Sequence, residues 1–151
     1  MEGNGLGSSS YWHWIIILVL IFFPLIFVFR SPPSGPNRFG AAPMPMSFGE
    51  AIASYFKNFV NFQGRAARSE YWFSFLFVLC SSVVIEIIDN SGIISLIWSL
   101  ILILFLPSIA VAARRLHDIN RSGWHQLLYC FAPVGLIVVI VWYCTPGRDE
   151  T

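Results

Sequence analysis

Charged residues are scarce in this chain of 151 residues: they make up 11% of it, whereas soluble domains carry about 25%. Nine basic residues against eight acidic ones leave a net charge of +1, so we expect no nucleic-acid partner. Hydrophobic residues make up 56% of the chain. This composition excludes an ordinary soluble domain and indicates a membrane protein.

The chain also lacks the motifs of common enzyme and metal sites. It has no G-x-S-x-G motif and no glycine-rich phosphate loop. Its three cysteines lie within apolar runs and are expected to serve packing, not a disulfide or a metal. The pair His117-Asp118 would need further metal ligands, and the other histidines, His13 and His125, are not placed to supply them. We therefore expect no enzyme activity, no cofactor and no metal site.

Four apolar runs of 18 to 21 residues dominate what is present. As helices they would be about 27–32 Å long, which matches the hydrocarbon core of a bilayer. The runs are Tyr11–Phe29, Tyr71–Ile88, Ile93–Ala113 and Trp124–Cys144. The sequence thus predicts an all-α polytopic membrane protein with four transmembrane helices.

Basic residues are distributed unevenly between the segments that join these runs. Eight of the nine Lys and Arg residues lie in two segments, 30–70 and 114–123, which are separated by two predicted crossings. Because Lys and Arg favour the cytoplasmic side of a membrane, we expect both segments to be cytoplasmic. The N-terminus and the C-terminus are then both expected outside.

The composition of the chain changes near residue 46, where a proline-rich linker gives way to a helical pattern. Residues 1–45 hold the first run and a proline-rich linker, which we expect to form an additional transmembrane helix and an extended segment. Ser47 and Glu50 then form an S-x-x-E capping box, followed by aromatic residues at helical spacing. The pattern predicts a short amphipathic helix, either in the membrane interface or packed against the other helices. Residues 148–151 are a short tail.

Three of the predicted spans contain a proline: Pro24, Pro107 and Pro133. Proline removes one backbone donor and crowds the carbonyl four residues earlier, so we expect a kink at each. In lipid the freed carbonyl needs a hydroxyl or a neighbouring helix as its partner.

Two polar stretches carry the most distinctive sequence. The first reads N-F-Q-G-R-A-A-R-S-E-Y-W over residues 61–72, and the second reads R-R-L-H-D-I-N-R-S-G-W over residues 114–124. Together they resemble the bacterial inner-membrane family catalogued as domain of unknown function 805, whose marks are N-F-x-G-R-x-x-R-x-E-Y-W and R-R-L-H-D-x-x-R-S-G-W. The resemblance covers residues 46–147 and implies a three-span membrane domain. It implies no particular reaction, because the family has none established.

The arginines of these two stretches are the candidate binding residues, because the predicted threading places both stretches on one side of the membrane. Arginine presents a planar fork suited to phosphate oxygens, and each basic residue near an anionic membrane contributes about 1 kcal/mol. The sequence favours a small scaffold or accessory protein with a cytoplasmic-side site for anionic lipid headgroups or an acidic partner. The candidate binding residues are Arg65, Arg68, Arg114, Arg115 and Arg121, and the residues expected to pair with them structurally are Glu70, His117 and Asp118.

Two other interpretations stay open. The arginines can serve only to orient the chain and to form internal ion pairs. Alternatively, Glu86, the one acid within a predicted span, can carry protons or ions in a small oligomeric transporter or channel component. A scaffold role would require another membrane protein, or a second copy of the chain, as partner.

Overall fold

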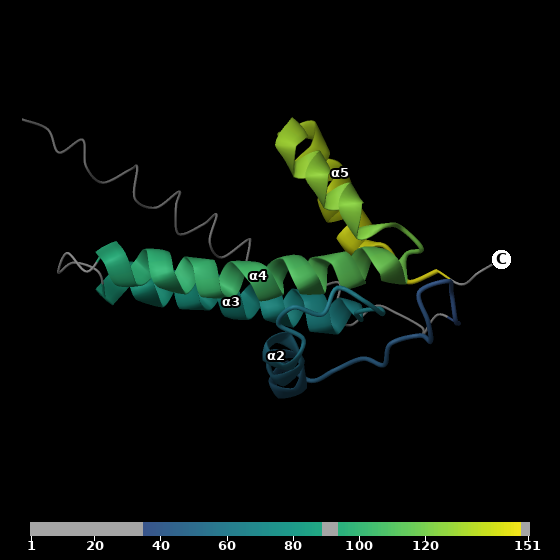
Figure 1. The fold of residues 1–151 in the computed structure, drawn as a ribbon, viewed down its shortest axis with the longest axis horizontal. Coiled ribbons are helices and arrows are strands. Elements are labelled where there is room, and N and C mark those ends of the chain that lie inside the picture. The colour runs from purple at the N-terminus through teal and green to yellow at the C-terminus, as the bar shows by residue number, and fades with distance from the viewer. Residues whose placement is uncertain (1–34, 89–93, 149–151) are drawn as a thin grey trace, which may run out of the picture.

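A computed structural model describes residues 35–88 and 94–148, and the side chains of these residues except 86–88 and 94–102. The first predicted span, Tyr11–Phe29, lies outside the described residues. Within them the chain forms helices and no strand, as predicted (Figure 1). The elements are α2 (Phe48–Lys57), α3 (Arg68–Ile88), α4 (Ile94–Asp118), the 3₁₀ helix η1 (Gly123–Phe131) and α5 (Val134–Cys144).

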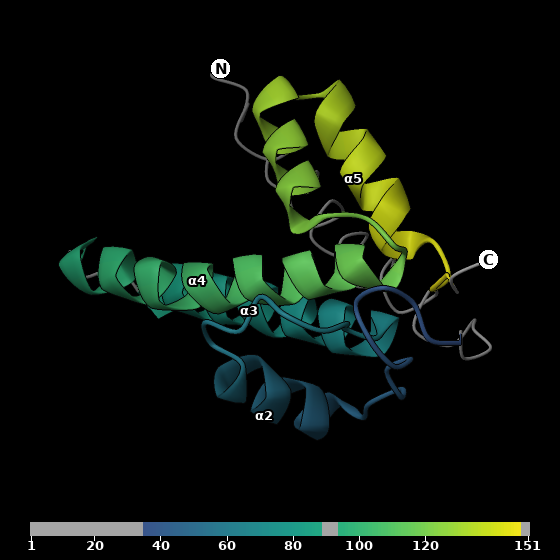
Figure 2. The same cartoon turned by 45° about the vertical axis from the view of Figure 1, so that its right-hand side comes forward.

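The centre of the fold is an antiparallel pair of helices, α3 and α4, which lie side by side (Figure 1, Figure 2). They correspond to the second and third apolar runs. Glu70, in the first turn of α3, forms an ion pair with Arg114 near the end of α4. The beginning of α3 therefore lies beside the end of α4. Within the described residues, α3 is the one helix that length and composition would allow to cross a membrane, over Arg68–Ile85.

Helix α2 packs against this pair on the side opposite the C-terminal elements (Figure 2). Its capping box forms as predicted, with the Ser47 amide donating to the Glu50 carboxylate at 2.7 Å. Tyr55 is buried against α3 and α4. Of the two environments that the sequence allowed for this helix, the structure therefore shows packing against the other helices.

Tyr55 also contacts the backbone of α4 in the turn that precedes Pro107, a proline that lies within the continuous helix. The Leu104 carbonyl oxygen lies 2.7 Å from the Tyr55 hydroxyl and 2.6 Å from the Ser108 hydroxyl. These hydroxyls contact the carbonyl of Leu104, which is the neighbour of the Ile103 carbonyl that Pro107 leaves without its helical donor. This contact fixes the position of α2 along α4.

The last apolar run is not a single helix. The sequence predicts a fourth transmembrane helix over Trp124–Cys144, but the chain turns back at residues 132–133, and η1 and α5 lie side by side as a hairpin (Figure 2). The arms of 9 and 11 residues are about 18 and 17 Å long, roughly half of a bilayer core. Pro133, which has no backbone donor, therefore lies at a reversal of the chain and not at a kink within a span.

Gly135 of α5 packs closely against the backbone of the other arm, η1. A methyl group at Gly135 would lie 1.8 Å from the carbonyl oxygen of Leu128, so a residue larger than glycine cannot be accommodated without movement. The outer surface of the hairpin is apolar, with exposed Phe131, Val134 and Ile137. An apolar hairpin of this length is typical of a segment that enters a membrane and returns to the same side.

The hairpin starts near the end of α4 and brings the residues that follow it back to the same end of α4. Arg115 Nε donates to the Tyr143 carbonyl oxygen at 3.1 Å, and the Arg148 amide donates to the Asp118 carbonyl oxygen at 2.9 Å. The sequence predicts a C-terminus on the side opposite residues 114–123, because it counts the last apolar run as a crossing, whereas the structure brings Arg148 beside Asp118. The side of the membrane on which the C-terminus lies stays a prediction.

A reporter at the C-terminus should reveal this reversal. Alkaline phosphatase needs disulfides that form in the periplasm. We expect it to be inactive when fused after Thr151 or after Arg121, and active when fused after Ile88, at the far end of α3. Phosphatase activity after Thr151 combined with none after Arg121 would show that the last run crosses the membrane.

Replacing Gly135 with alanine should disturb the hairpin. Because the added methyl group meets backbone, we expect Gly135→Ala to lower the free energy of unfolding by about 1–3 kcal/mol, seen as a lower Tm in detergent. Gly49→Ala in α2 is the matched control, since a methyl group there meets nothing within 4 Å and should leave the Tm unchanged or slightly higher. Equal Tm values for the two variants would contradict the close contact.

Candidate functional site

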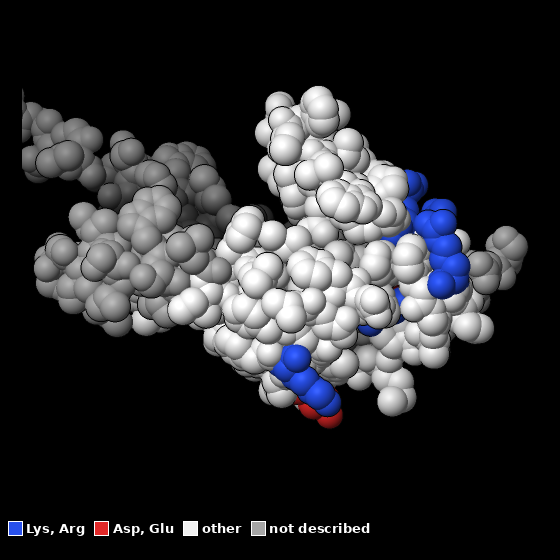
Figure 3. Space-filling view, in the orientation of Figure 1, with Lys and Arg blue, Asp and Glu red and all other residues white. Residues whose placement is uncertain are grey.

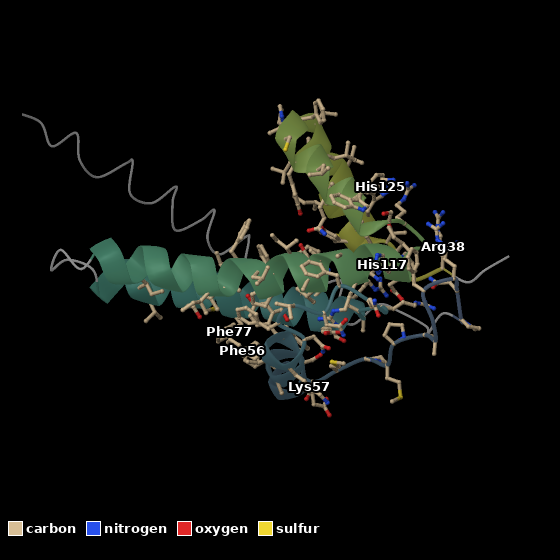
Figure 4. The ribbon with its side chains drawn as sticks, viewed as in Figure 1. Arg38, Phe56, Lys57, Phe77, His117 and His125 are labelled. Atoms are coloured by element: carbon tan, nitrogen blue, oxygen red, sulfur yellow. The ribbon has the colours of Figure 1, made fainter. Side chains whose placement is uncertain are left out.

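The two polar stretches meet at one end of the α3–α4 pair, where Figure 4 shows His117 close to Arg38. Four of the five candidate arginines are buried there, each exposed by 8% or less, together with two acids. We call these six residues the arginine cluster: Arg65, Arg68, Arg114, Arg115, Glu70 and Asp118. The cluster combines the start of α3, the loop before it and the end of α4, so the predicted meeting of the two stretches occurs in the structure.

Asp118 joins two of these arginines through its two carboxylate oxygens. Oδ1 lies 2.8 Å from Arg65 Nη2 and accepts a hydrogen bond from Arg65 Nε at 3.0 Å, while Oδ2 accepts one from Arg115 Nη1. Arg65 precedes α3, whereas Arg115 belongs to α4. One carboxylate therefore ties the two polar stretches together through charge-assisted hydrogen bonds, which are stronger than neutral ones.

The other nitrogens of these two arginines hold irregular backbone in place. Arg65 Nη1 donates to the carbonyl oxygens of Gly35 and Gly40, at 2.7 and 3.1 Å. Arg115 donates to the carbonyl oxygens of Tyr143 and Thr145 at the end of α5. Carbonyls at a helix C-terminus carry partial negative charge, so a guanidinium group there is favourable. Arg65 thereby positions the linker, and Arg115 positions the hairpin.

Glu70 and Arg114 form a second ion pair, with Glu70 Oε1 2.6 Å from Arg114 Nη1. The Ser54 hydroxyl of α2 donates to the same carboxylate oxygen at 2.8 Å. The Ala66 amide donates to the Arg114 carbonyl oxygen at 3.0 Å. Three segments that are far apart in the sequence therefore converge on this pair.

Arg68 differs from the other three arginines because it makes no ion pair with any described residue. Its Nη1 lies 3.4 Å from the Cys144 carbonyl oxygen, and its Nη2 is buried with no hydrogen-bond partner in the described part of the chain. Nε and Nη2 of Arg114 also lack partners there. Four buried arginines against two carboxylates leave a surplus of two positive charges in the cluster.

Burial has a measurable consequence for these groups. Loss of hydration lowers the pKa of Arg115 to about 10, while the nearby Asp118 carboxylate opposes the shift. Arginine side chains keep their charge at neutral pH. The cluster therefore retains its positive surplus under physiological conditions.

Two predicted site residues lie at the edge of the cluster. His117 Nδ1 is 3.0 Å from the carbonyl oxygen of Gly64, whose φ of 79° makes the turn there, and burial lowers the pKa of this histidine. The His117 ring stacks on Phe39 with centroids 4.0 Å apart. Arg121 instead lies over the Trp142 ring of the hairpin, at 4.1 Å. Among the described residues, no group of three His, Cys, Asp or Glu could hold a metal ion.

Accessible positive charge comes largely from residues that the sequence analysis did not select. Figure 3 shows arginine side chains gathered where α4 ends and the hairpin begins, and a separate basic patch on α2, where Lys57 lies. Arg38 and Arg148 are exposed, and Arg38 Nη2 donates to the Asn120 carbonyl oxygen at 3.0 Å. The linker is anchored by Asn37, whose Nδ2 donates to the His117 carbonyl oxygen at 3.0 Å. Such contacts to backbone leave no pattern in a sequence.

The same polar stretches relate this chain to known proteins. The profile of the family described as "Protein of unknown function (DUF805)" matches residues 59–151. The chain belongs to this family. DUF805 membership confirms the resemblance drawn from the two motifs.

Two curated relatives of this DUF805 chain come from Escherichia coli (strain K12). Inner membrane protein YhaH is 37% identical over 106 residues, which cover 62% of this chain and 86% of YhaH. Inner membrane protein YhaI is 42% identical over 105 residues, which cover 64% of this chain and 84% of YhaI. No solved structure matches. The family and these relatives make the chain a bacterial inner-membrane protein.

Removing the shared carboxylate should destabilise the fold. We expect Asp118→Asn to lower the free energy of unfolding by about 3–5 kcal/mol, because two buried arginines lose their counter-charge. Thermal unfolding in detergent would measure this. Glu50→Gln, in the exposed capping box of α2, changes the charge equally and is expected to have a smaller effect. A loss for Asp118→Asn no greater than for the control would show that the arginines do not depend on Asp118.

Proposed function

We propose that this chain is a small inner-membrane scaffold protein that binds the anionic headgroup of a phospholipid at the cytoplasmic side of the arginine cluster. The observation that supports this proposal is the buried positive surplus. Arg68 has no ion pair among the described residues, and three guanidinium nitrogens of Arg68 and Arg114 lack hydrogen-bond partners there.

A buried charge without a counter-ion is unfavourable by several kcal/mol, and arginine does not relieve this by losing its proton at neutral pH. An anion that enters the cluster would supply both the missing charge and the missing acceptors. Phosphate oxygens match the guanidinium fork in geometry. The cluster also lies at the end of α3, the helix suited to cross a membrane, which is the depth of headgroup phosphates.

This proposal assigns different roles to the predicted arginines. Arg65 and Arg115 bind Asp118 and backbone carbonyls, so they support the fold. Arg68 and Arg114 have donors without partners in the described part of the chain and would contact the phosphate. Arg121, half-buried at the base of the hairpin, would lie at the rim.

The alternative interpretation, a transporter or channel component, depends on Glu86, whose side chain lies outside those described. No contact among the described residues favours it over lipid binding. An acidic segment of a partner protein, or of a second copy of the chain, would satisfy the same nitrogens as a phosphate. The experiment below distinguishes this acidic segment from a lipid as the ligand.

Arg68→Gln tests the proposal directly. Wild-type protein in lipid-preserving nanodiscs should retain anionic phospholipid, detected by mass spectrometry. We expect Arg68→Gln to retain at most about one tenth of the anionic phospholipid that the wild type retains, because hydrogen bonds to charged groups contribute about 1.5–3 kcal/mol. Lys57→Gln, an exposed residue of α2, is the matched control and should retain lipid as the wild type does.

Equal retention of anionic lipid by the wild type and Arg68→Gln would overturn the proposal. A second outcome would also reject it. If Arg68→Gln keeps its lipid but loses a protein that co-purifies with the wild type, the cluster binds an acidic protein segment instead.

A further inference from the structure

A cavity of about 520 Å³ lies between the C-terminal hairpin and the α3–α4 pair. Its volume falls within the range of about 300–1,000 Å³ that is usual for small-ligand sites. Its wall is chiefly apolar and carries a few hydroxyl groups. The wall residues that matter here are Tyr71, Ser74, Phe105, Ser108, Leu127 and Tyr129.

The cavity begins where the arginine cluster ends. Ser74 follows Arg68 by six residues on α3, and Ser108 precedes Arg114 by six residues on α4. At about 1.5 Å per residue, both serines lie about 9 Å from the cluster along the helix axes. A molecule with its charged group at the cluster would therefore extend into this cavity.

The surroundings of the cavity point to a hydrocarbon chain as its occupant. One wall belongs to α3, the helix suited to cross a membrane, and another to the hairpin, whose outer surface is apolar. Leu127 lines the cavity and is 58% exposed, so the cavity communicates with the outside of the hairpin. In a bilayer the medium at this surface consists of acyl chains, which fill an apolar space more favourably than water does.

Ser74 supplies a second, polar indication. Ser74 lines the cavity and is 1% exposed, and its hydroxyl has no hydrogen-bond partner among the described residues. A buried hydroxyl without a partner is unfavourable and normally finds an acceptor. The ester carbonyl of a phospholipid lies on the acyl-chain side of its phosphate and would supply such an acceptor.

We infer that this cavity holds one acyl chain of a phospholipid whose phosphate lies at the arginine cluster, so that the hairpin and the α3–α4 pair enclose a single lipid. This inference rests on the proposed function and narrows its ligand class, because a soluble anion would leave the cavity and Ser74 unoccupied.

A photoreactive phospholipid tests the inference. Phosphatidylglycerol with a diazirine in mid-chain would be incorporated into nanodiscs with the full chain and irradiated, and the labelled residues would be identified by mass spectrometry. We expect labels at Phe105 and Leu127 to exceed those at Val84, which lies on α3 outside the cavity and is 53% exposed. Equal labelling of Leu127 and Val84 would overturn the inference, whatever the variants show.

A cavity-filling variant sharpens the result. Ser74→Phe should reduce labelling of Leu127 to the level at Val84, because the phenyl ring occupies the space of the chain. Val84→Phe adds the same type of ring to the outer face of α3 and should leave the labelling of Leu127 unchanged. If Ser74→Phe folds and Leu127 is labelled as in the wild type, the cavity does not hold the chain.

The two proposals can fail separately. Strong labelling of Leu127 by phosphatidylethanolamine as well as by phosphatidylglycerol, with anionic retention unchanged in Arg68→Gln, would reject the headgroup site and support the acyl-chain cavity. Loss of anionic lipid in Arg68→Gln, with uniform labelling of all exposed apolar residues, would reject the cavity and support the headgroup site.

Discussion

A buried guanidinium group must find hydrogen-bond acceptors and a counter-charge, and this requirement organises one end of the molecule. Arg115 is completely buried, and its donors reach the Asp118 carboxylate and the carbonyl oxygens of Tyr143 and Thr145. Arg65 reaches the same carboxylate and two carbonyls of the linker. Arginine side chains thus hold the linker and the end of the hairpin in place, in addition to the apolar packing of Val139 and Tyr143.

Such contacts have particular value in a membrane. Apolar helices gain little from burying their surfaces against one another in lipid, because the lipid chains are as apolar as the helices. Buried ion pairs add little net stability relative to apolar residues, but each is specific for one position. Ser54 of α2 reaches Glu70, and the end of α5 reaches Arg115, so polar contacts specify one arrangement among many of similar apolar packing.

Local chemistry explains which parts of this structure the sequence could predict. Long apolar composition predicts α3 and α4, and the Ser47 capping box predicts the start of α2. The hairpin could not be predicted from Pro133 alone, because a proline within a span usually causes a kink; the contact of Gly135 with Leu128 is visible only in three dimensions. For the site, charge distribution and the family motifs predict which residues gather. The charge distribution and the motifs do not predict which arginines Asp118 binds. On a helix, Arg114 and Arg115 lie four and three positions before Asp118 and are both its neighbours, but the structure pairs Asp118 with Arg115. The second partner, Arg65, comes from the other polar stretch.

The reversal of the last run is also consistent with the distribution of charge along the chain. If residues 124–144 crossed the membrane, the Tyr143 and Thr145 carbonyls would lie about 30 Å from Arg115, which would lose those acceptors, and the cavity would lose a wall. A crossing would also separate Arg148 from the other eight Lys and Arg residues. With the reversal, Arg148 would lie on the same side as the other eight, which agrees with the preference of Lys and Arg for one side of a membrane. The hairpin therefore supplies acceptors to the buried Arg115, and in a membrane it would also bring Arg148 to the side of the other basic residues.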